Sequence, residues 1–169
     1  MVQERREKVD GSTSPGLAHA LDAAYHLIQG KTVCFGMADT IIQPGDVFAR
    51  SLENAEEEDC VILNLFSTDH PEKFGMVQLD QDKRVVEIVD KPQETELTEM
   101  WGSIIWRSCF TDYLHHCVGK EHIADFAKIM NSAITNGLRF RGFTFADSVY
   151  IDLGTYEEIL ELDRRFREE

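Results

Sequence analysis

Two continuous apolar runs constrain the fold of this chain more than any other feature of its sequence. They occupy residues 32–37 (TVCFGM) and 60–66 (CVILNLF), and neither alternates regularly with polar residues. Strands of this kind are typical of a sheet that is covered on both faces. Segments with helical spacing of apolar residues separate these runs from each other and from later strands. The pattern therefore predicts a layered α/β fold with a mixed sheet.

The remaining elements follow from periodicity and from turn residues. Ser14 is expected to cap a helix that begins at Pro15 and ends at Gly30. Residues 74–80 and 84–90 flank a polar turn and predict an antiparallel hairpin. The other expected elements are helices over 46–54, 108–116, 122–136 and 156–167, and strands over 101–106, 139–146 and 148–152. Residues 1–13 are expected to form a loop or a disordered end, which leaves 14–169 as a single domain.

Composition excludes several classes of partner. The chain has 169 residues, of which 43% are apolar, and this suits one globular domain with a real core. Its formal net charge of -14 argues against binding nucleic acid or an anionic membrane through a basic face. No apolar stretch approaches the roughly 20 residues of a membrane span. The charged N-terminus does not resemble a signal peptide, so a cytoplasmic location is expected.

The cysteines and histidines predict no metal cluster and no disulfide. The four cysteines are far apart and form no C-x-x-C pair, so we expect reduced, structural thiols. A zinc site is not expected from the His115, His116, Cys117 and His122 group, because no second Cys/His pair accompanies it.

Two aspartates follow apolar strands and are the strongest candidates for a site. Asp39 follows the first apolar run, and Asp152 lies in the run Tyr-Ile-Asp-Leu-Gly-Thr at 150–155, just before a predicted helix. Carboxylates at strand ends lie where open α/β sheets bind ligands, so the two could converge on one divalent ion. The alternative is that each aspartate only caps a helix or a turn.

Three further positions suggest ligand contact, and each has a structural alternative. Gly16 lies at a helix start, where free N–H groups favour anions, although it could be a plain helix entry. Lys91 is followed by Pro92, which would hold the lysine where it can neutralise a phosphate; it could also be a solvated turn residue. Gly102, inside a strand, indicates close approach by a ligand or a bulge.

Together these motifs resemble the sugar-1-phosphate nucleotidylyltransferases, such as glucose-1-phosphate thymidylyltransferase. The resemblance covers roughly residues 12 to 165 and rests on order and spacing rather than on any single motif. It implies a three-layer, Rossmann-like sheet that is mostly parallel, with an antiparallel hairpin. The matching segments are Gly16-Leu17-Ala18, Ala38-Asp39, Phe74-Gly75, Asp90-Lys91-Pro92, Gly102, and Tyr150-Ile151-Asp152-Leu153-Gly154-Thr155.

The resemblance also implies a reaction and its participants. A sugar-1-phosphate oxygen would attack the α-phosphorus of a nucleoside triphosphate and release pyrophosphate. Asp39 and Asp152 would ligate Mg²⁺ between the two phosphates. Lys91 would be the catalytic lysine that holds the sugar phosphate. Such a step depends mostly on positioning and charge neutralisation.

The other matched positions would bind the two substrates. Asp90, where the family usually has Glu, would contact sugar hydroxyls with a shorter reach. Gly102 would offer its backbone to the sugar, and Gly16 would lie beside the base.

One departure from the family pattern changes the expected activity. The family begins with a strand and a glycine-rich loop, G-x-G-T-R, which grips the triphosphate, and residues 1–13 contain neither. The resemblance therefore implies a truncated domain whose sheet lacks its first strand and has a free edge. We expect an incomplete nucleotidyltransferase that is inactive alone. The alternatives are a non-catalytic module that binds a sugar phosphate or a metal, and a homo-oligomer that assembles through that edge.

Overall fold

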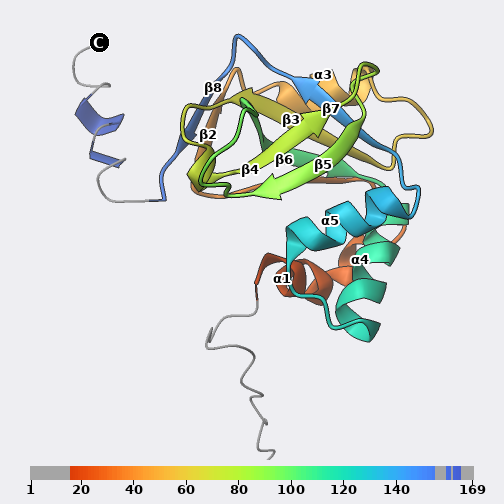
Figure 1. Cartoon of the computed structure of the whole chain (residues 1–169). Helices are drawn as coiled ribbons and strands as arrows, with labels where there is room; N and C mark the ends of the chain where they lie inside the picture. Colours follow the sequence, from red (N-terminus) through yellow and green to blue (C-terminus); the bar gives the residue numbers. More distant parts are fainter. Residues whose placement is uncertain (1–15, 155–158, 161, 165–169) are drawn as a thin grey trace, which may run out of the picture.

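The computed structural model describes residues 16–154, 159, 160 and 162–164 of the chain (Figure 1). In this part of the chain the strands form a six-stranded sheet and a separate two-stranded one. The large sheet has the order β5–β4–β6–β3–β7, and β1 also pairs with β6. Its strands are β1 (Val33–Gly36), β3 (Val61–Ser67), β4 (Gly75–Leu79), β5 (Val85–Asp90), β6 (Glu99–Trp106) and β7 (Phe140–Thr144). The small sheet pairs β2 (Thr40–Gln43) with β8 (Val149–Asp152).

Strand direction confirms the predicted mixed α/β sheet. Strands β1, β3, β4 and β7 run in one direction, while β5 and β6 run in the other. The β4–β5 hairpin lies where the sequence predicts it. Because β6 lies between strands that run the other way, its pairings with β1, β3 and β4 are all antiparallel. Strands β3 and β7 are neighbours and pair in parallel.

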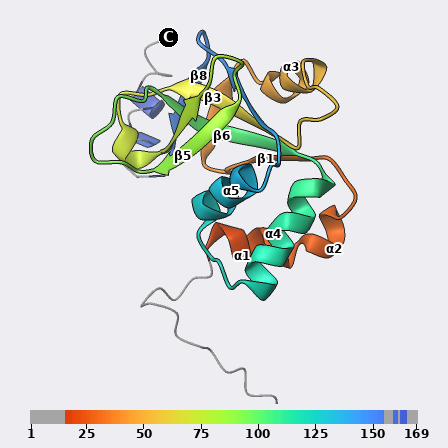
Figure 2. The same ribbon diagram turned by 45° about the vertical axis from the view of Figure 1, so that its right-hand side comes forward.

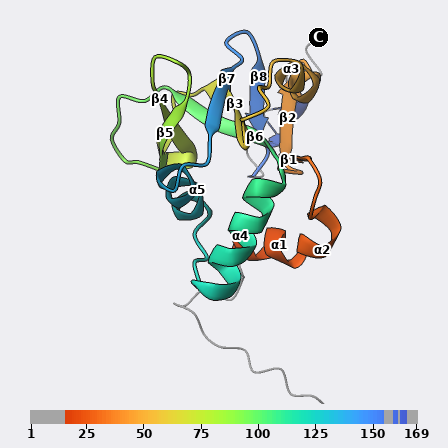
Figure 3. The same cartoon turned by 90° about the vertical axis from the view of Figure 1, so that its right-hand side faces the viewer.

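The sheet lies between two layers, each with its own apolar core. The helices α1 (Leu17–Ala23), α2 (Tyr25–Ile28), α4 (Ser108–Lys120) and α5 (Phe126–Thr135) gather on one side of the sheet (Figure 2). The other side carries α3 (Val47–Glu53) beside β2 and β8 (Figure 3). Trp106, Phe110 and Phe140 are buried in the first core, and Phe66 and Met100 in the second. These two cores explain the apolar pattern of β3, which is buried along its length except at Ser67.

Helix boundaries differ from the predictions at their ends. The first helix begins at Leu17 with Gly16 as its N-cap, and it is interrupted at Ala24; Ser14 and Pro15 lie outside the described residues. The helix predicted over 122–136 begins only at Phe126, because the side chain of Asp125 accepts a hydrogen bond from the Lys128 N–H and caps it. Of the helix predicted over 156–167, residues 159, 160 and 162–164 are described and helical, and the rest lie outside, as do residues 1–13.

The prediction that the first apolar run is a buried strand is wrong for β1. Val33 and Phe35 are half-buried, while Cys34 and Gly36 are exposed. The cause is its place in the sheet, since within the described residues β1 pairs with β6 along one edge only. An apolar sequence predicts a strand, but its burial depends on neighbours on both sides.

The prediction of four reduced thiols is wrong for two of the cysteines, because Cys60 and Cys109 form a disulfide. Cys60 directly precedes β3, and Cys109 lies in the first turn of α4, just after β6. The antiparallel pairing of Val61 with Trp106 brings these strand ends together. The cysteines are far apart in sequence and adjacent only in the fold. Cys34 and Cys117 are free.

None of the helices in the described residues combines the length and apolar character that crossing a membrane requires.

Candidate functional site

A cavity of about 380 Å³, called here the site cavity, opens beside β6 where two strands part. Along one edge of β6, β1 pairs with residues 103–106 and β4 pairs with Met100, which leaves Trp101 at the gap. Side chains from the end of β1, the start of β4 and the end of β8 therefore surround this gap. The lining residues are Leu17, Met37, Asp39, Thr40, Lys73, Phe74, Gly75, Asp90, Lys91, Trp101, Asp125, Phe126, Ala127, Tyr150, Asp152 and Gly154.

The small sheet brings the two predicted aspartates to this cavity. Thr40 pairs with Asp152 in the β2–β8 ladder, and the Leu153 N–H donates to the Asp39 carbonyl at 2.8 Å. Asp39 lies in the turn that precedes β2 and is exposed, whereas Asp152 ends β8 and is half-buried. The Asp152 side chain accepts a hydrogen bond from the Gly154 N–H at 3.1 Å, which fixes its orientation. Both residues line the site cavity.

The hairpin β4–β5 supplies the predicted Asp90 and Lys91 to the same cavity. Asp90 pairs with Gly75 at the open end of the hairpin, and the Lys91 N–H donates to the Phe74 carbonyl at 3.0 Å. Lys91 has φ 48°, a left-handed conformation that is rare outside glycine and asparagine. Strained backbone of this kind is often found at functional sites.

Tyr150 is a residue of the site that sequence reasoning did not select. Its hydroxyl lies 3.3 Å from the Thr40 hydroxyl, and its ring packs edge-on against Phe74 with centroids 5.8 Å apart. Burial raises the pKa of the Tyr150 phenol; the Thr40 hydrogen bond opposes this, and the carboxylates of Asp152 and Asp39 add to it. The phenol is therefore held in its neutral form.

The structure places the two predicted glycines outside the cavity lining. Gly102 is buried beneath the Tyr150 ring, and a Cβ added there would lie 2.3 Å from the ring carbon Cε2. Its glycine character is thus explained by the aromatic ring that lies on it. Gly16 is exposed at the start of the seven-residue α1, and an added Cβ would meet only the Ala124 carbonyl, at 3.6 Å. The neighbouring Leu17 lines the cavity instead.

Two charged residues of the lining were also missed. Lys73 ends a short 3-10 helix, η1 (Pro71–Lys73), that precedes β4. Asp125 is the N-cap of α5 and pairs with Lys128 at 3.5 Å. Neither sequence neighbourhood differs from that of an ordinary loop, because their relation to the site arises from the position of the hairpin and of α5.

The chemistry of the lining fits a hard divalent cation. Mg²⁺ is usually bound through one or two carboxylates together with phosphate oxygens of a substrate. Asp152 supplies a carboxylate from the end of β8, and Asp39 supplies another from the turn that precedes its partner strand β2. Within the described residues no three Asp, Glu, His or Cys side chains gather as a metal cluster of their own. A cation bound here would thus take its remaining ligands from the phosphate of a substrate.

The fold and the cavity define a class: an α/β domain whose ligand site lies where strands part at the sheet. A family model described as "Nucleotidyl transferase" matches residues 1–169, and the chain belongs to this family. Within it, the expected resemblance to sugar-1-phosphate nucleotidylyltransferases is confirmed.

Curated relatives are similar over part of the chain. The bifunctional protein GlmU of Methanococcus vannielii is 32% identical over 90 residues, which are 52% of this chain and 19% of that protein. GlmU of Methanococcus maripaludis is 29% identical over 84 residues, or 49% of this chain and 18% of that protein. The matched region is thus about a fifth of the length of these relatives.

Solved structures share the fold at low identity. A UDP-glucose pyrophosphorylase in complex with UDP-glucose has a TM-score of 0.77 at 16% identity, covering 93% of this chain and 64% of the other. A UTP-bound UGPase from Acinetobacter baumannii has a TM-score of 0.73 at 13% identity, covering 89% and 56%. These likenesses show the fold alone, and this chain spans less than two thirds of each neighbour.

Proposed function

We propose that the site cavity binds a sugar 1-phosphate together with Mg²⁺, as the acceptor half of a nucleotidyl-transfer site. The observation that carries this proposal is the β2–β8 pairing, which sets Asp39 and Asp152 in the same cavity as Asp90 and Lys91. Family membership and the named ligands of the structural neighbours, UDP-glucose and UTP, support the substrate class.

Some lining residues would bind the ligand through charge and others through hydrogen bonds. Lys91 neutralises the sugar phosphate as a point charge, and its strained backbone holds the side chain at the end of the hairpin. Asp90 accepts hydrogen bonds from sugar hydroxyls. Asp39 and Asp152 hold the cation, which when bound would stabilise the charge that develops between two phosphates.

The described lining of the cavity carries more negative than positive charge, so a phosphate needs the cation in order to bind there. This lining contains four carboxylates, from Asp39, Asp90, Asp125 and Asp152, against the two amines of Lys73 and Lys91. A nucleoside triphosphate would bring several further negative charges. Each preorganised donor that is missing from such a site raises the barrier by about 3–4 kcal/mol. We therefore propose that nucleotidyl transfer needs additional cationic groups, and that the chain without them is a binding module.

Calorimetry of α-glucose 1-phosphate, with and without Mg²⁺, tests the proposal. We expect binding that depends on Mg²⁺ and that weakens at least about tenfold in Lys91→Met, equivalent to roughly 1.4 kcal/mol. Lys83→Met is the matched control, because Lys83 lies in the hairpin turn and outside the cavity lining. With UTP or dTTP added, no pyrophosphate should be released.

Two results would contradict the proposal. If glucose 1-phosphate, N-acetylglucosamine 1-phosphate and mannose 1-phosphate all fail to bind, the sugar-phosphate assignment is wrong. If pyrophosphate is released at an ordinary enzymatic rate, the assignment as a non-catalytic module is wrong.

A further inference from the structure

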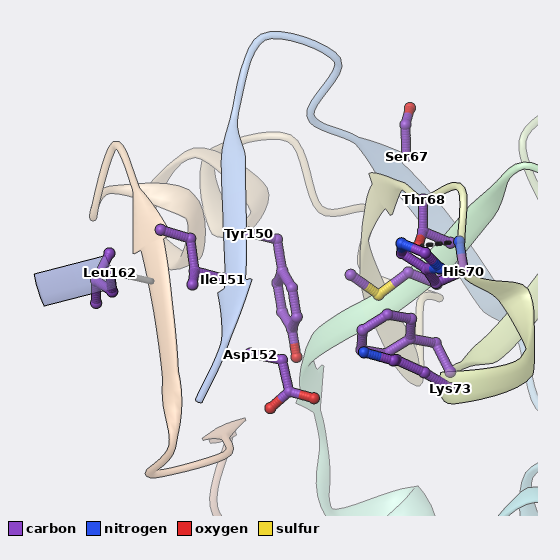
Figure 4. A pocket seen from close by; sticks show the side chains of 10 residues that line it. Ser67, Thr68, His70, Lys73, Tyr150, Ile151, Asp152 and Leu162 are labelled. Carbon is purple, nitrogen blue, oxygen red and sulfur yellow. Dashed lines mark hydrogen bonds between the residues drawn. The ribbon is translucent and has the colours of Figure 1, made fainter. Parts of the chain in front are cut away.

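A second cavity, of about 340 Å³ (Figure 4), has Tyr150 in its lining, as the site cavity does. We call it the outer cavity. It shares four lining residues with the site cavity, Lys73, Phe74, Tyr150 and Asp152. Its other lining residues are Ser67, Thr68, His70, Met100, Ile151 and Leu162. The two spaces are thus neighbouring lobes with a common wall.

The common wall is held from several sides. The ring of Tyr150 packs against Phe74 and Phe66, and Gly102 leaves the room that it occupies. The Thr40 hydroxyl holds the phenol end of the same ring. A wall fixed in this way is preorganised, so a ligand that contacts it loses little free energy in ordering it.

Polar groups face this wall from the opposite side of the outer cavity. Figure 4 shows Tyr150 and Asp152 on one strand, with His70 and Lys73 across the space. The segment that carries them is ordered by its own hydrogen bonds: the His70 N–H donates to the Thr68 hydroxyl at 3.0 Å, and the Lys73 N–H to the His70 carbonyl at 3.1 Å. The backbone that carries these side chains is thus ordered beside an aromatic surface.

This lining distinguishes between classes of ligand. An aromatic ring beside a carboxylate, two hydroxyls and two nitrogen donors matches a polyhydroxylated ring, which has apolar faces and a hydrogen-bonding edge. An alkyl chain would make no use of the hydrogen-bonding capacity of this lining. A second phosphate would meet Asp152, and also Glu72, which lies 3.4 Å from His70. The volume lies within the range of small-molecule pockets.

We propose that the outer cavity binds a second sugar ring, so that the acceptor is an oligosaccharide 1-phosphate or a sugar 1-phosphate with a glycosyl substituent. This inference rests on the proposed function, which it deepens by naming the size of the acceptor. The first ring lies with its phosphate at Lys91, the second lies in the outer cavity, and the bond that links them passes along the residues that border both lobes. Asp152 borders both lobes and contributes to both.

Calorimetry with α-glucose 1-phosphate and α-maltose 1-phosphate, both with Mg²⁺, tests the inference. We expect the wild-type chain to bind the maltose derivative at least about tenfold more tightly. Ser67→Trp fills the outer cavity from an exposed position that the site cavity does not share. It should abolish this preference and leave the affinity for glucose 1-phosphate within about twofold. Gln78→Trp, also exposed on a strand and remote from both linings, should keep the preference.

The outcomes separate the two proposals. Equal affinities for the two phosphates, or a preference that survives in Ser67→Trp, overturn the second-ring assignment and leave the proposed function intact. If neither phosphate binds, the proposed function and its extension are both overturned.

Discussion

The backbone N–H of Leu153 donates a hydrogen bond of 2.8 Å to the carbonyl oxygen of Asp39, although the two residues lie near opposite ends of the described chain. This bond continues the β2–β8 ladder by one step beyond the pair of Thr40 with Asp152. It ties the segment after β1 to the segment after β8. The relative position of the Asp39 and Asp152 backbones is therefore set by this pairing.

Replacing either carboxylate should remove cation-dependent ligand binding. We expect Asp39→Asn or Asp152→Asn to weaken the binding of glucose 1-phosphate in Mg²⁺ at least about tenfold, because one charged ligand of the cation is lost. The backbone ladder should persist in both variants. Isothermal calorimetry, with circular dichroism to verify the fold, measures the effect.

Asp147→Asn is the matched control for this experiment. Asp147 is exposed between β7 and β8 and does not line the cavity. Its replacement should leave the affinity unchanged. If the three variants weaken binding equally, the effect comes from net charge and the assignment of a cation site is wrong.

The left-handed backbone at Lys91 separates two contributions of this residue. A left-handed conformation costs a residue with a Cβ about 1–2 kcal/mol, and glycine adopts it freely at some loss of chain entropy. We expect Lys91→Gly to raise the free energy of unfolding by about 0.5–1 kcal/mol while it abolishes sugar-phosphate binding. Urea unfolding and calorimetry measure the two effects.

Lys83 supplies the control for the backbone effect. It has φ 61° in the turn of the same hairpin, outside the cavity lining. Lys83→Gly should stabilise the chain to a similar degree and leave binding intact. If Lys91→Gly destabilises the chain while Lys83→Gly does not, the Lys91 side chain has a structural role and the strain argument fails.

Thiol titration distinguishes the disulfide of the structure from the four reduced thiols that the sequence predicts. Two thiols per unfolded chain, those of Cys34 and Cys117, should react with a thiol reagent before reduction, and four after it. The loop between Cys60 and Cys109 spans 49 positions. In the chain-entropy model its closure contributes about 4 kcal/mol, so the paired Cys60→Ser, Cys109→Ser variant should unfold at a much lower urea concentration. Cys34→Ser, at an exposed free cysteine, is the control for the unfolding experiment. In the titration, four reactive thiols before reduction would show that the bond is absent.

The sequence predicted the parts of this fold that depend on local pattern. The hairpin, the helix after β6 and the strand-end positions of Asp39 and Asp152 all follow from periodicity and turn residues. The strand β2 was missed, because it has only four residues and its stability comes from β8, far along the chain. The exposure of β1 was also missed, since burial depends on the strands beside it.

The candidate site shows the same division between local pattern and tertiary packing. Asp90 and Lys91 stand out because a turn and a proline follow a strand. Tyr150 opens a matched segment, but its position between the two cavities could not be predicted, because it depends on the room left by Gly102. The sequence marked Gly102 as a close approach, and the neighbour that approaches in the structure is Tyr150 itself.

A methyl group added at Gly102 tests this packing. In Gly102→Ala the new Cβ would lie 2.3 Å from Tyr150 Cε2 and 2.7 Å from Phe66 Cδ2, so at least one ring must move. Overpacking of this kind typically costs about 1–3 kcal/mol, and we expect a loss of that size in the free energy of unfolding by urea. Moving Tyr150 should also change both cavities, and so weaken sugar-phosphate binding.

Gly119→Ala is the matched control: this exposed glycine in α4 has no neighbour within 4 Å of an added Cβ, so the change should stabilise the helix by up to about 1 kcal/mol. If both variants stabilise the chain, the Tyr150 ring is free to move and the wall between the two cavities is not fixed.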